Sequence, residues 1–375
     1  AQVFEYIKHA DEFGIKIDNY SVDFKEVIKR SRATATNMSK GIDYLMKKNK
    51  ITIISGTAQL TQNKTVKVIG DNKEEHNYSA QHIIIATGAR SRELPNLKQN
   101  GKNIIGYREA MNLKKAPKSM IIVGSGAIGV EFAYFYNTMG TKVTIVEYLP
   151  RIVPNEDNDI SKELAKNLKK KGIDILTNSN IEEIKEGNNL STVTINSNNS
   201  TKSLSAEIIL SAVGITPNTQ NIGLEDLKIA LDNERIIVDQ YYRTNIEGYY
   251  AIGDVIKGPA LAHVASAEGI ICIENIAGHN PEPIDYNNVP GCTYCSPEIA
   301  SVGLTEEKAK ENGYDVKIGK FPFSASGKAS AAGHKEGFVK IIYDAKYGEL
   351  LGAHMIGYNV TEMIAEIVAA KKLET

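Results

Sequence analysis

The amino-acid sequence predicts an α/β protein in which a parallel sheet with crossover helices is followed by an α+β segment. Three observations support this prediction. Strand-like and helix-like patterns alternate between residues 119 and 215, as in a parallel sheet joined by helices. A glycine-rich turn stands between one of these strands and the helix that follows it. After residue 288, short strands are joined by tight turns, which is typical of antiparallel pairing.

The composition is that of a globular protein with room for several domains. The 375 residues are 42% hydrophobic and 24% charged. The net charge of −1 gives no strong field to attract nucleic acid or an anionic membrane, and no apolar run has membrane-spanning length. We therefore expect no nucleic-acid partner and no membrane insertion. Three cysteines form no secreted disulfide framework, which favours a reducing compartment.

Helices and strands are predicted along the whole chain. A long amphipathic helix is predicted over residues 22–48, with an apolar stripe formed by Phe24, Val27, Ile28, Met38, Ile42 and Leu45. Strands are predicted at 51–54, 65–69, 82–88, 338–344 and 350–357, and a last helix near Val360. The first of these elements precede the alternating region, and the last two strands and the last helix belong to the antiparallel segment after residue 288.

Changes in pattern divide the chain into the segments 1–115, 116–245, 246–287 and 288–375. A Pro/Lys-rich link, LKKAPKS, precedes the alternating strands and helices of the second segment. The third segment contains a buried strand that ends in a turn, GYYAIGDV, and continues as a helix. The fourth, with its antiparallel pattern, indicates a separate α+β domain.

The stretch SMIIVGSGAIGVEFAYFYNTMGTKVTIVE, residues 119–147, contains the most informative motif. An apolar strand leads into Gly124, Gly126 and Gly129 in the pattern G-x-G-x-x-G, and a helix follows at once. The first glycine permits a tight turn, the second lets backbone approach a pyrophosphate, and the third lets the helix pack on the strand. Free N–H groups at the helix N-terminus favour the same anion. The motif therefore predicts a dinucleotide site.

A second strand of this unit ends in Glu147, which indicates the kind of dinucleotide. A carboxylate at this place can accept hydrogen bonds from both ribose hydroxyls of an adenosine, and it would repel a 2′-phosphate. NAD is therefore favoured over NADP. Arg151 could favour NADP, but it lies beyond the strand end and is interpreted as a surface arginine.

Further stretches make the chain resemble the flavin-dependent pyridine nucleotide–disulfide oxidoreductases. They occur in family order: IIIATGARSRELP (83–95), IIVGSGAIGVEF (121–132), VEYLPRIVPNED (146–157), SAVGITPNT (211–219), YYAIGDVIKGPALAHVASAEG (249–269) and CTYCSPEIASVGLTE (292–306). The sequence GPALAHVASAEG, together with Glu147, favours the branch of the family that oxidises protein-bound dihydrolipoamide.

The resemblance implies an α/β fold with two Rossmann-like nucleotide-binding domains, for FAD and NAD, plus an α+β dimerisation domain. Segments 1–115 and 246–287 would form the FAD-binding domain, 116–245 the NAD-binding domain and 288–375 the dimerisation domain. The first strand and phosphate loop of the FAD-binding domain are expected before Ala1.

The FAD contacts of the family can be transferred residue by residue. Asp254 would accept a hydrogen bond from the ribityl chain, and backbone amides at the start of the next helix would approach the flavin ring. The implied FAD-binding residues are Ala58, Thr87, Gly88, Asp254, Ala260, Leu261, Ala262 and His263. An ordinary turn, helix start or edge strand is the alternative interpretation for each.

The NAD contacts follow in the same way. Glu131 and Gly214 would lie near the nicotinamide, and Ile181 would line the adenine pocket. The implied NAD-binding residues are Gly124, Ser125, Gly126, Ala127, Ile128, Gly129, Glu131, Glu147, Ile181 and Gly214. The alternatives are a surface glutamate for Glu131 and a core isoleucine for Ile181. No metal site is expected.

The resemblance places no catalytic residue within this chain. In the family, dihydrolipoamide is oxidised through an enzyme disulfide and FAD, and a hydride passes to NAD⁺. A His of near-neutral pKa, oriented by a carboxylate, accepts the substrate thiol proton. The redox cysteine pair is expected before Ala1, and the His and its Glu partner after Thr375. The chain alone is therefore expected to be inactive.

The resemblance also implies partners and a location. It predicts a homodimer that serves lipoyl-bearing components of 2-oxoacid dehydrogenase or glycine cleavage systems. The expected location is the bacterial cytoplasm, or the mitochondrial matrix if the source is eukaryotic. Two alternatives remain open. One is another flavin-dependent NAD(P)H reductase or transhydrogenase of the family, and the other is a non-catalytic, truncated nucleotide-binding protein.

Cys292 and Cys295 have the C-x-x-C spacing of a dithiol centre, but their surroundings favour a structural role. Pro and Gly precede the pair, and β-compatible residues separate the cysteines. In an extended stretch, residues three apart have Cα atoms roughly 10 Å apart, whereas a disulfide needs about 4.4–6.8 Å. A zinc site would need two further ligands, which the sequence does not provide nearby.

Overall fold

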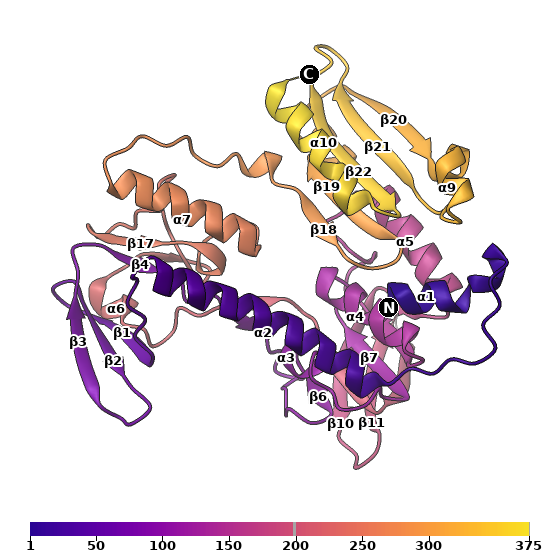
Figure 1. Cartoon of the computed structure of the whole chain (residues 1–375), viewed down its shortest axis with the longest axis horizontal. Coiled ribbons are helices and arrows are strands. Elements are labelled where there is room, and N and C mark those ends of the chain that lie inside the picture. The colour runs from indigo at the N-terminus through magenta and orange to yellow at the C-terminus, as the bar shows by residue number, and fades with distance from the viewer. Residues whose placement is uncertain (198–199, 375) are drawn as a thin grey trace. The chain divides into compact units, whose positions relative to one another are not determined.

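The computed structural model describes residues 1–197 and 200–374 and divides into two compact units (Figure 1). Unit 1 comprises Ala1–Ser31, Ser91–Gly214 and Asn287–Thr375, and unit 2 comprises Arg32–Arg90 and Ile215–Tyr286. Each unit is therefore assembled from segments that are distant in sequence, and each has its own hydrophobic core.

A five-stranded parallel sheet forms the centre of unit 1, in the order β6-β13-β7-β8-β9. Its strands are β6 (Ile104–Ile105), β7 (Ser119–Val123), β8 (Lys142–Val146), β9 (Asp174–Leu176) and β13 (Ile208–Ser211). The helices on this part of the chain are α3 (Tyr107–Ala110), α4 (Ala127–Thr138) and α5 (Asn158–Lys170). Four consecutive residues of β7 are buried, as expected for a strand in the middle of a parallel sheet. The predicted alternation of strands and helices is confirmed.

A three-stranded antiparallel sheet, which the sequence analysis did not anticipate, is inserted between β9 and β13. It consists of β10 (Ser179–Lys185), β11 (Ser191–Ser197) and β12 (Ser200–Ala206). In β11 the apolar residues Val193 and Ile195 are buried, whereas Thr192 and Thr194, which alternate with them, are only partly buried. This alternation gives the small sheet one face that packs on the core.

A second five-stranded sheet, wholly antiparallel, forms the C-terminal part of unit 1 (Figure 1). Its order is β18 (Gly291–Thr293), β19 (Glu298–Gly303), β22 (Leu350–Gly357), β21 (Phe338–Asp344) and β20 (Val316–Pro322). Helix α10 (Val360–Leu373) packs on this sheet, while α8 (Glu306–Glu311) and α9 (Gly327–Ala331) lie in its connections. The two predicted strands and the predicted last helix are confirmed.

The N-terminal helices contribute to both units. Helices α1 (Gln2–Lys8) and η1 (Ala10–Phe13) belong to unit 1, whereas α2 (Phe24–Lys48) is divided between unit 1 and unit 2. Helix α2 confirms the helix predicted over 22–48, and its Phe24 packs beside Phe135 and Tyr136. The predicted apolar stripe is not buried along its whole length, because Met38 is 70% and Ile42 58% exposed. Helical spacing shows that apolar residues share a face, but it does not show that another element covers that face.

Unit 2 contains short parallel strands, small antiparallel sheets, the C-terminal part of α2 and one further long helix. Its elements are β1 (Thr57–Thr61), β2 (Thr65–Ile69), β3 (Glu75–Ser79), β4 (Ile83–Ile85), β5 (Ala89–Ser91), β14 (Ile215–Pro217), α6 (Leu224–Leu227), β15 (Leu231–Asp232), β16 (Arg235–Ile236), β17 (Tyr249–Ala251), η2 (Gly253–Val255) and α7 (Ala262–Ile276). The single turn η3 (Tyr286–Asn288) marks the change from unit 2 to unit 1. None of the described helices is long and apolar enough to cross a membrane.

Two strand predictions in unit 2 require correction. The strand predicted at 51–54 is absent, and residues 51–55 have no regular structure. The β-branched residues in this stretch are exposed and pair with no neighbouring strand, and strand propensity alone does not create a partner. The strand predicted over 82–88 is confirmed only for its three isoleucines, which form β4. The strand at 65–69 is confirmed as β2, and the helix predicted after GYYAIGDV as α7.

We expect the substitution Leu164→Ala to lower the free energy of unfolding by about 2–5 kcal/mol, because it leaves a cavity in a packed core. Leu164 on α5 is fully buried in the core of unit 1. The matched control is Leu190→Ala, since Leu190 belongs to the same unit and is 50% exposed. It should change stability by no more than about 0.5 kcal/mol. Chemical denaturation measures both, and equal effects would contradict this placement of the core.

Candidate functional site

The glycine motif lies where the parallel sheet of unit 1 reverses its winding. Strand β8 follows β7 on one side, whereas β13 lies on the other side of β7. Ligands of open parallel sheets bind at the carboxyl ends of strands that flank such a switch point. Gly124 follows β7, and Ala212 to Gly214 follow β13, with Ala212 N donating to Val123 O at 2.8 Å. The structure therefore brings these two predicted NAD-binding stretches to the same edge.

The three glycines of the motif have different surroundings. Gly124 has a φ of +96°, and a Cβ atom there would collide with the Ala212 carbonyl. A Cβ atom on Gly129 would collide with the Gly124 carbonyl oxygen. At Gly126 a Cβ atom would meet nothing within 4 Å. Two of the glycines thus allow backbone to touch backbone, and the third leaves open space at the start of α4.

The N-terminus of α4 is suited to an anion. Gly126 is its N-cap residue, no side chain caps the helix, and its first turn contains no acidic residue. The first N–H groups of a helix have no partner within it and lie at the positive end of its dipole. Ala127, the first residue of the helix, is exposed. The open space at Gly126 and the uncapped N–H groups together fit the pyrophosphate of a dinucleotide.

Glu147 directly follows β8 and is almost completely buried. Its Oε2 accepts hydrogen bonds from Ser125 N at 2.8 Å and Ser125 Oγ at 2.5 Å. Its Oε1 accepts one from Leu149 N at 2.8 Å. A carboxylate offers about four acceptor positions, so Oε1 can still accept from a ribose hydroxyl. Glu147 therefore also holds the glycine loop in place, a role that the sequence analysis did not foresee.

The remaining predicted NAD contacts lie in different environments. Glu131, on α4, accepts a hydrogen bond from Tyr294 N at 2.8 Å, and burial raises the pKa of its carboxyl. Gly214 is exposed, with a φ of +106°, and its carbonyl accepts from Arg92 N at 3.0 Å. Ile181 lies in β10 and is buried in the hydrophobic core. Glu131 and Gly214 thus present polar groups, while Ile181 contributes packing.

The structure also gathers several predicted FAD contacts within unit 2. Strands β4 and β17 are parallel neighbours, so the segments after their carboxyl ends lie together. Thr87 and Gly88 follow β4, and Asp254 follows β17. Glu268, which the sequence analysis missed, holds the turn after β17 in place. Glu268 is buried, and its Oε2 accepts from Gly253 N at 2.6 Å while its Oε1 accepts from Tyr286 Oη at 2.7 Å.

Two further predicted FAD contacts present free backbone N–H groups. The segment from Ala260 to His263 forms the start of α7, where Leu261 is an N-cap residue without a side-chain cap and Ala262 and His263 are exposed. Ala58 lies in β1, at the edge of its sheet. Leu60 N in the same strand donates away from β2 to Ile222 O, so the N–H of Ala58, two residues earlier, also points away from β2. Both features fit a ligand that accepts hydrogen bonds.

The three cysteines are free thiols in surroundings that disfavour reactivity. Burial raises the pKa of Cys272 to about 11. Burial likewise raises the pKa values of Cys292 and of the fully buried Cys295, whose Sγ contacts Pro297 O at 3.1 Å. A redox thiol needs a lowered pKa to supply thiolate at neutral pH. Only the first part of the predicted extended stretch is a strand, because β18 ends at Thr293.

The comparisons with known proteins agree with this geometry. A family model for the pyridine nucleotide-disulphide oxidoreductases matches residues 7–269, and the dimerisation domain of that family matches residues 289–375. The chain therefore belongs to the pyridine nucleotide-disulphide oxidoreductase family. It is an oxidoreductase with FAD and NAD as cofactors, and its dimerisation domain supports a homodimer. The described residues contain no group of His, Cys, Asp and Glu side chains that could hold a metal ion.

Individual relatives narrow the relationship. The dihydrolipoyl dehydrogenase of Rhizobium etli is 45% identical over 393 residues, covering 100% of this chain and 82% of that protein. The dihydrolipoyl dehydrogenase of Zymomonas mobilis is 46% identical over 378 residues, covering 100% and 81%. The crystal structure of LpdA from Mycobacterium tuberculosis superimposes with a TM-score of 0.92 at 24% identity, covering 100% of this chain and 81% of that one. This last likeness concerns the fold.

We expect Gly129→Ala to destabilise the fold and Gly126→Ala to leave its stability unchanged. A methyl group at Gly129 would collide with the backbone carbonyl of Gly124. Backbone cannot rotate away as a flexible side chain can, so this variant should be strongly destabilised. A methyl group at Gly126 meets open space, and its φ of −66° is allowed for alanine, so thermal stability should be unchanged. Thermal denaturation measures both, and equal melting temperatures would contradict the backbone contact.

Proposed function

We propose that the intact protein is a dihydrolipoyl dehydrogenase. It would oxidise protein-bound dihydrolipoamide to lipoamide through an enzyme disulfide, with electrons passing to NAD⁺. The observation that supports this most strongly is the glycine loop at the β7–β13 switch point, with Glu147 beside it. The identity of 45–46% to two dihydrolipoyl dehydrogenases supports the choice of reaction within the family.

We assign NAD to the switch point of unit 1. The backbone N–H groups of α4 would hold the pyrophosphate, and Glu147 would accept from the adenosine ribose while it fixes Ser125. The residues Gly124, Ser125, Gly126, Ala127, Ile128, Gly129, Glu131, Glu147 and Gly214 would line this site, with Ile181 behind it in the core. Residues 116–214 of the predicted segment 116–245 belong to unit 1, and this part of the segment would form the NAD-binding domain.

We assign FAD to the edge of unit 2 formed after β4 and β17. Asp254 and the backbone at Thr87 and Gly88 would hold the ribityl and pyrophosphate portion, the start of α7 would approach the flavin, and Ala58 N–H would face the adenine. When bound, FAD supplies two-electron chemistry between a dithiol and NAD⁺. The protein's part is to fix the turn that carries Asp254, and the buried Glu268 contributes by accepting a hydrogen bond from Gly253 N. Of the predicted segments 1–115 and 246–287, residues 32–90 and 246–286 belong to unit 2 and would contribute to this domain.

We assign the dithiol of the reaction to cysteines other than Cys272, Cys292 and Cys295. Thiol–disulfide exchange needs an accessible thiolate. Cys272 and Cys295 are buried, and all three thiols have raised pKa values. The family resemblance would place the redox pair before Ala1 and the catalytic His with its Glu partner after Thr375. The substrates would be lipoyl-bearing components of 2-oxoacid dehydrogenase or glycine cleavage systems, in the bacterial cytoplasm.

We expect the full-length protein to reduce NAD⁺ with dihydrolipoamide, and the double variant Cys292→Ala, Cys295→Ala to keep kcat within about twofold. The two thiols have no part in the exchange, so their removal leaves the reaction intact. Turnover is followed as NADH absorbance, with a matched Cys272→Ala variant as control. Loss of activity in the double variant with FAD still bound would contradict the assignment. Diaphorase activity without dihydrolipoamide oxidation would favour another reductase or a transhydrogenase.

We expect the substitution Glu147→Gln to reduce the preference for NAD⁺ over NADP⁺ by about tenfold, equivalent to about 1.4 kcal/mol. The neutral amide removes the charge that repels a 2′-phosphate. The ratio of kcat/KM values for the two nucleotides measures the effect in full-length protein. The control is Glu183→Gln, because Glu183 is exposed on β10. An unchanged ratio would show that Glu147 supports the glycine loop alone.

A further inference from the structure

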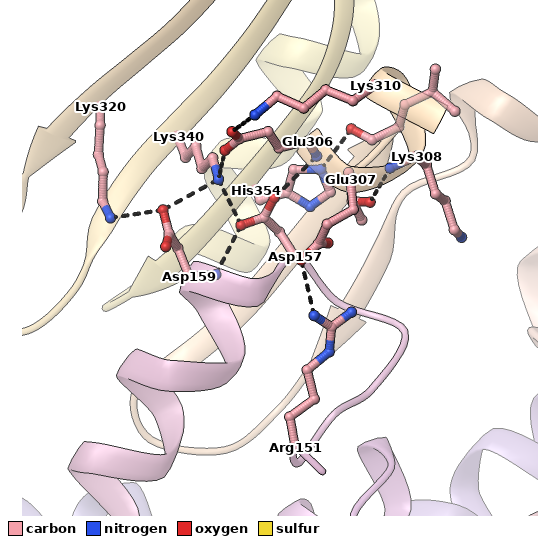
Figure 2. Close-up of polar contacts among 12 residues, drawn as sticks. Arg151, Asp157, Asp159, Glu306, Glu307, Lys308, Lys310, Lys320, Lys340 and His354 are labelled. Atoms are coloured by element: carbon pink, nitrogen blue, oxygen red, sulfur yellow. Dashed lines mark hydrogen bonds and ion pairs between the residues drawn. The ribbon is translucent and has the colours of Figure 1, made fainter. Parts of the chain in front are cut away.

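Unit 1 contains a buried ion cluster that the proposed reaction does not use. Lys340, on β21 of the antiparallel sheet, is 2% exposed. Its Nζ lies 2.8 Å from Asp157 Oδ1, 2.7 Å from Glu306 Oε2 and 3.2 Å from Asp159 Oδ2. Figure 2 shows the three carboxylates directed at this one ammonium group. Asp157 is fully buried and is also the N-cap residue of α5.

The cluster anchors one end of a loop whose other end is in the candidate NAD site. The loop, residues 147–157, connects β8 to α5. At its start, Glu147 holds Ser125 of the glycine loop. In its middle, Val153 N donates to Ser125 O at 2.9 Å. At its end, Asp157 Oδ1 accepts from Lys340 Nζ, and Asp157 Oδ2 accepts from Glu306 N at 3.2 Å. The antiparallel sheet is thereby linked to the glycine loop.

The loop is strained at the point where it meets the glycine loop. Val153 has a φ of +40°, a left-handed conformation that β-branched residues avoid. Such a conformation persists only where the surroundings fix it. Val153 and Ile152 are buried, and Ser161 Oγ donates to Ile152 O at 2.7 Å. The anchors on both sides of Val153 therefore hold its amide against Ser125.

We propose that Lys340 is a positioning residue for the NAD site, which acts through Asp157 to hold Val153 against Ser125. The inference rests on the proposed NAD site. Lys340 touches no part of that site itself, so its effect passes along the loop. Neighbouring His354, opposite Lys340 in the β21–β22 pairing, is buried with its pKa lowered by that burial, so it adds no competing charge at neutral pH.

Lys320 provides a matched control for Lys340. Both lysines lie in the same antiparallel sheet and both pair with Asp159 Oδ2, Lys320 at 3.1 Å. Lys320 is 42% exposed and lies outside the pair with Asp157, as Figure 2 shows. The variant Lys320→Met therefore removes one ammonium group from the cluster and leaves the anchor of the loop in place.

The test measures NAD⁺ kinetics of the full-length enzyme with saturating dihydrolipoamide. We expect Lys340→Met to raise the KM for NAD⁺ about tenfold with kcat within about twofold, because the loop is loosened while the chemistry is unchanged. Lys320→Met should leave both parameters within about twofold. An unchanged KM in Lys340→Met, or the same rise in both variants, would overturn the proposal. Absence of NAD⁺ turnover in the wild type would instead overturn the proposed function.

A second substitution separates positioning from a general loss of stability. Glycine adopts a φ of +40° without strain. In the Lys340→Met background, Val153→Gly should therefore bring the KM for NAD⁺ back toward the wild-type value. The same change removes a buried side chain, so thermal stability should fall further. If KM rises in step with the loss of stability, the role of Lys340 is only structural and the proposal fails.

Should Lys340→Met not fold, Asp157→Asn provides the same test in milder form. The asparagine keeps an oxygen that can cap α5 but loses the ion pair. We expect a KM for NAD⁺ raised about threefold with kcat unchanged, and a return toward the wild-type KM when Val153→Gly is added. A lowered melting temperature with an unchanged KM would overturn the proposal.

Discussion

The contact between backbones at the β7–β13 switch point is the constraint on which the rest of unit 1 depends. Gly124 meets the Ala212 carbonyl, and Gly129 meets Gly124, with no side chain between them. This close packing brings the N-terminus of α4 to the carboxyl ends of the parallel strands. It also sets Ser125 within reach of Glu147. The sheet order, the start of the helix and the clamp on the loop therefore follow from the absence of two methyl groups.

The sequence predicted the features that short stretches determine by themselves. The strand, glycines and helix of residues 119–147 were predictable because apolar residues favour the buried strand and glycines permit the tight turn before the helix. Strands β21 and β22 were predictable because their turn is short and both stretches are rich in apolar residues. The family resemblance extended these local results to cofactors and reaction, which the spacing of residues alone does not specify.

Features that depend on distant partners were beyond prediction from the sequence. Residues 51–54 have the composition of a strand, but no neighbouring strand pairs with them. Met38 continues the apolar stripe of α2, although no described element buries it. The role of Glu268 could not be predicted from the sequence, because its hydrogen bond to Gly253 joins residues that only the folded chain brings together. Ser125 and Glu147 were each predicted as ligand contacts, yet their mutual hydrogen bonds appear only in three dimensions.

The burial of Lys340 and Asp157 also constrains how the sequence can change over evolution. The two residues are 183 positions apart, and each is almost inaccessible to solvent. Loss of the Lys340 charge leaves the buried Asp157 carboxylate without its counter-ion, which is costly, whereas loss of the Asp157 charge leaves Lys340 paired with Glu306 and Asp159. A substitution that removes the charge of Lys340 should therefore be tolerated only where Asp157 has changed as well, so that two positions far apart in the sequence change in a fixed order.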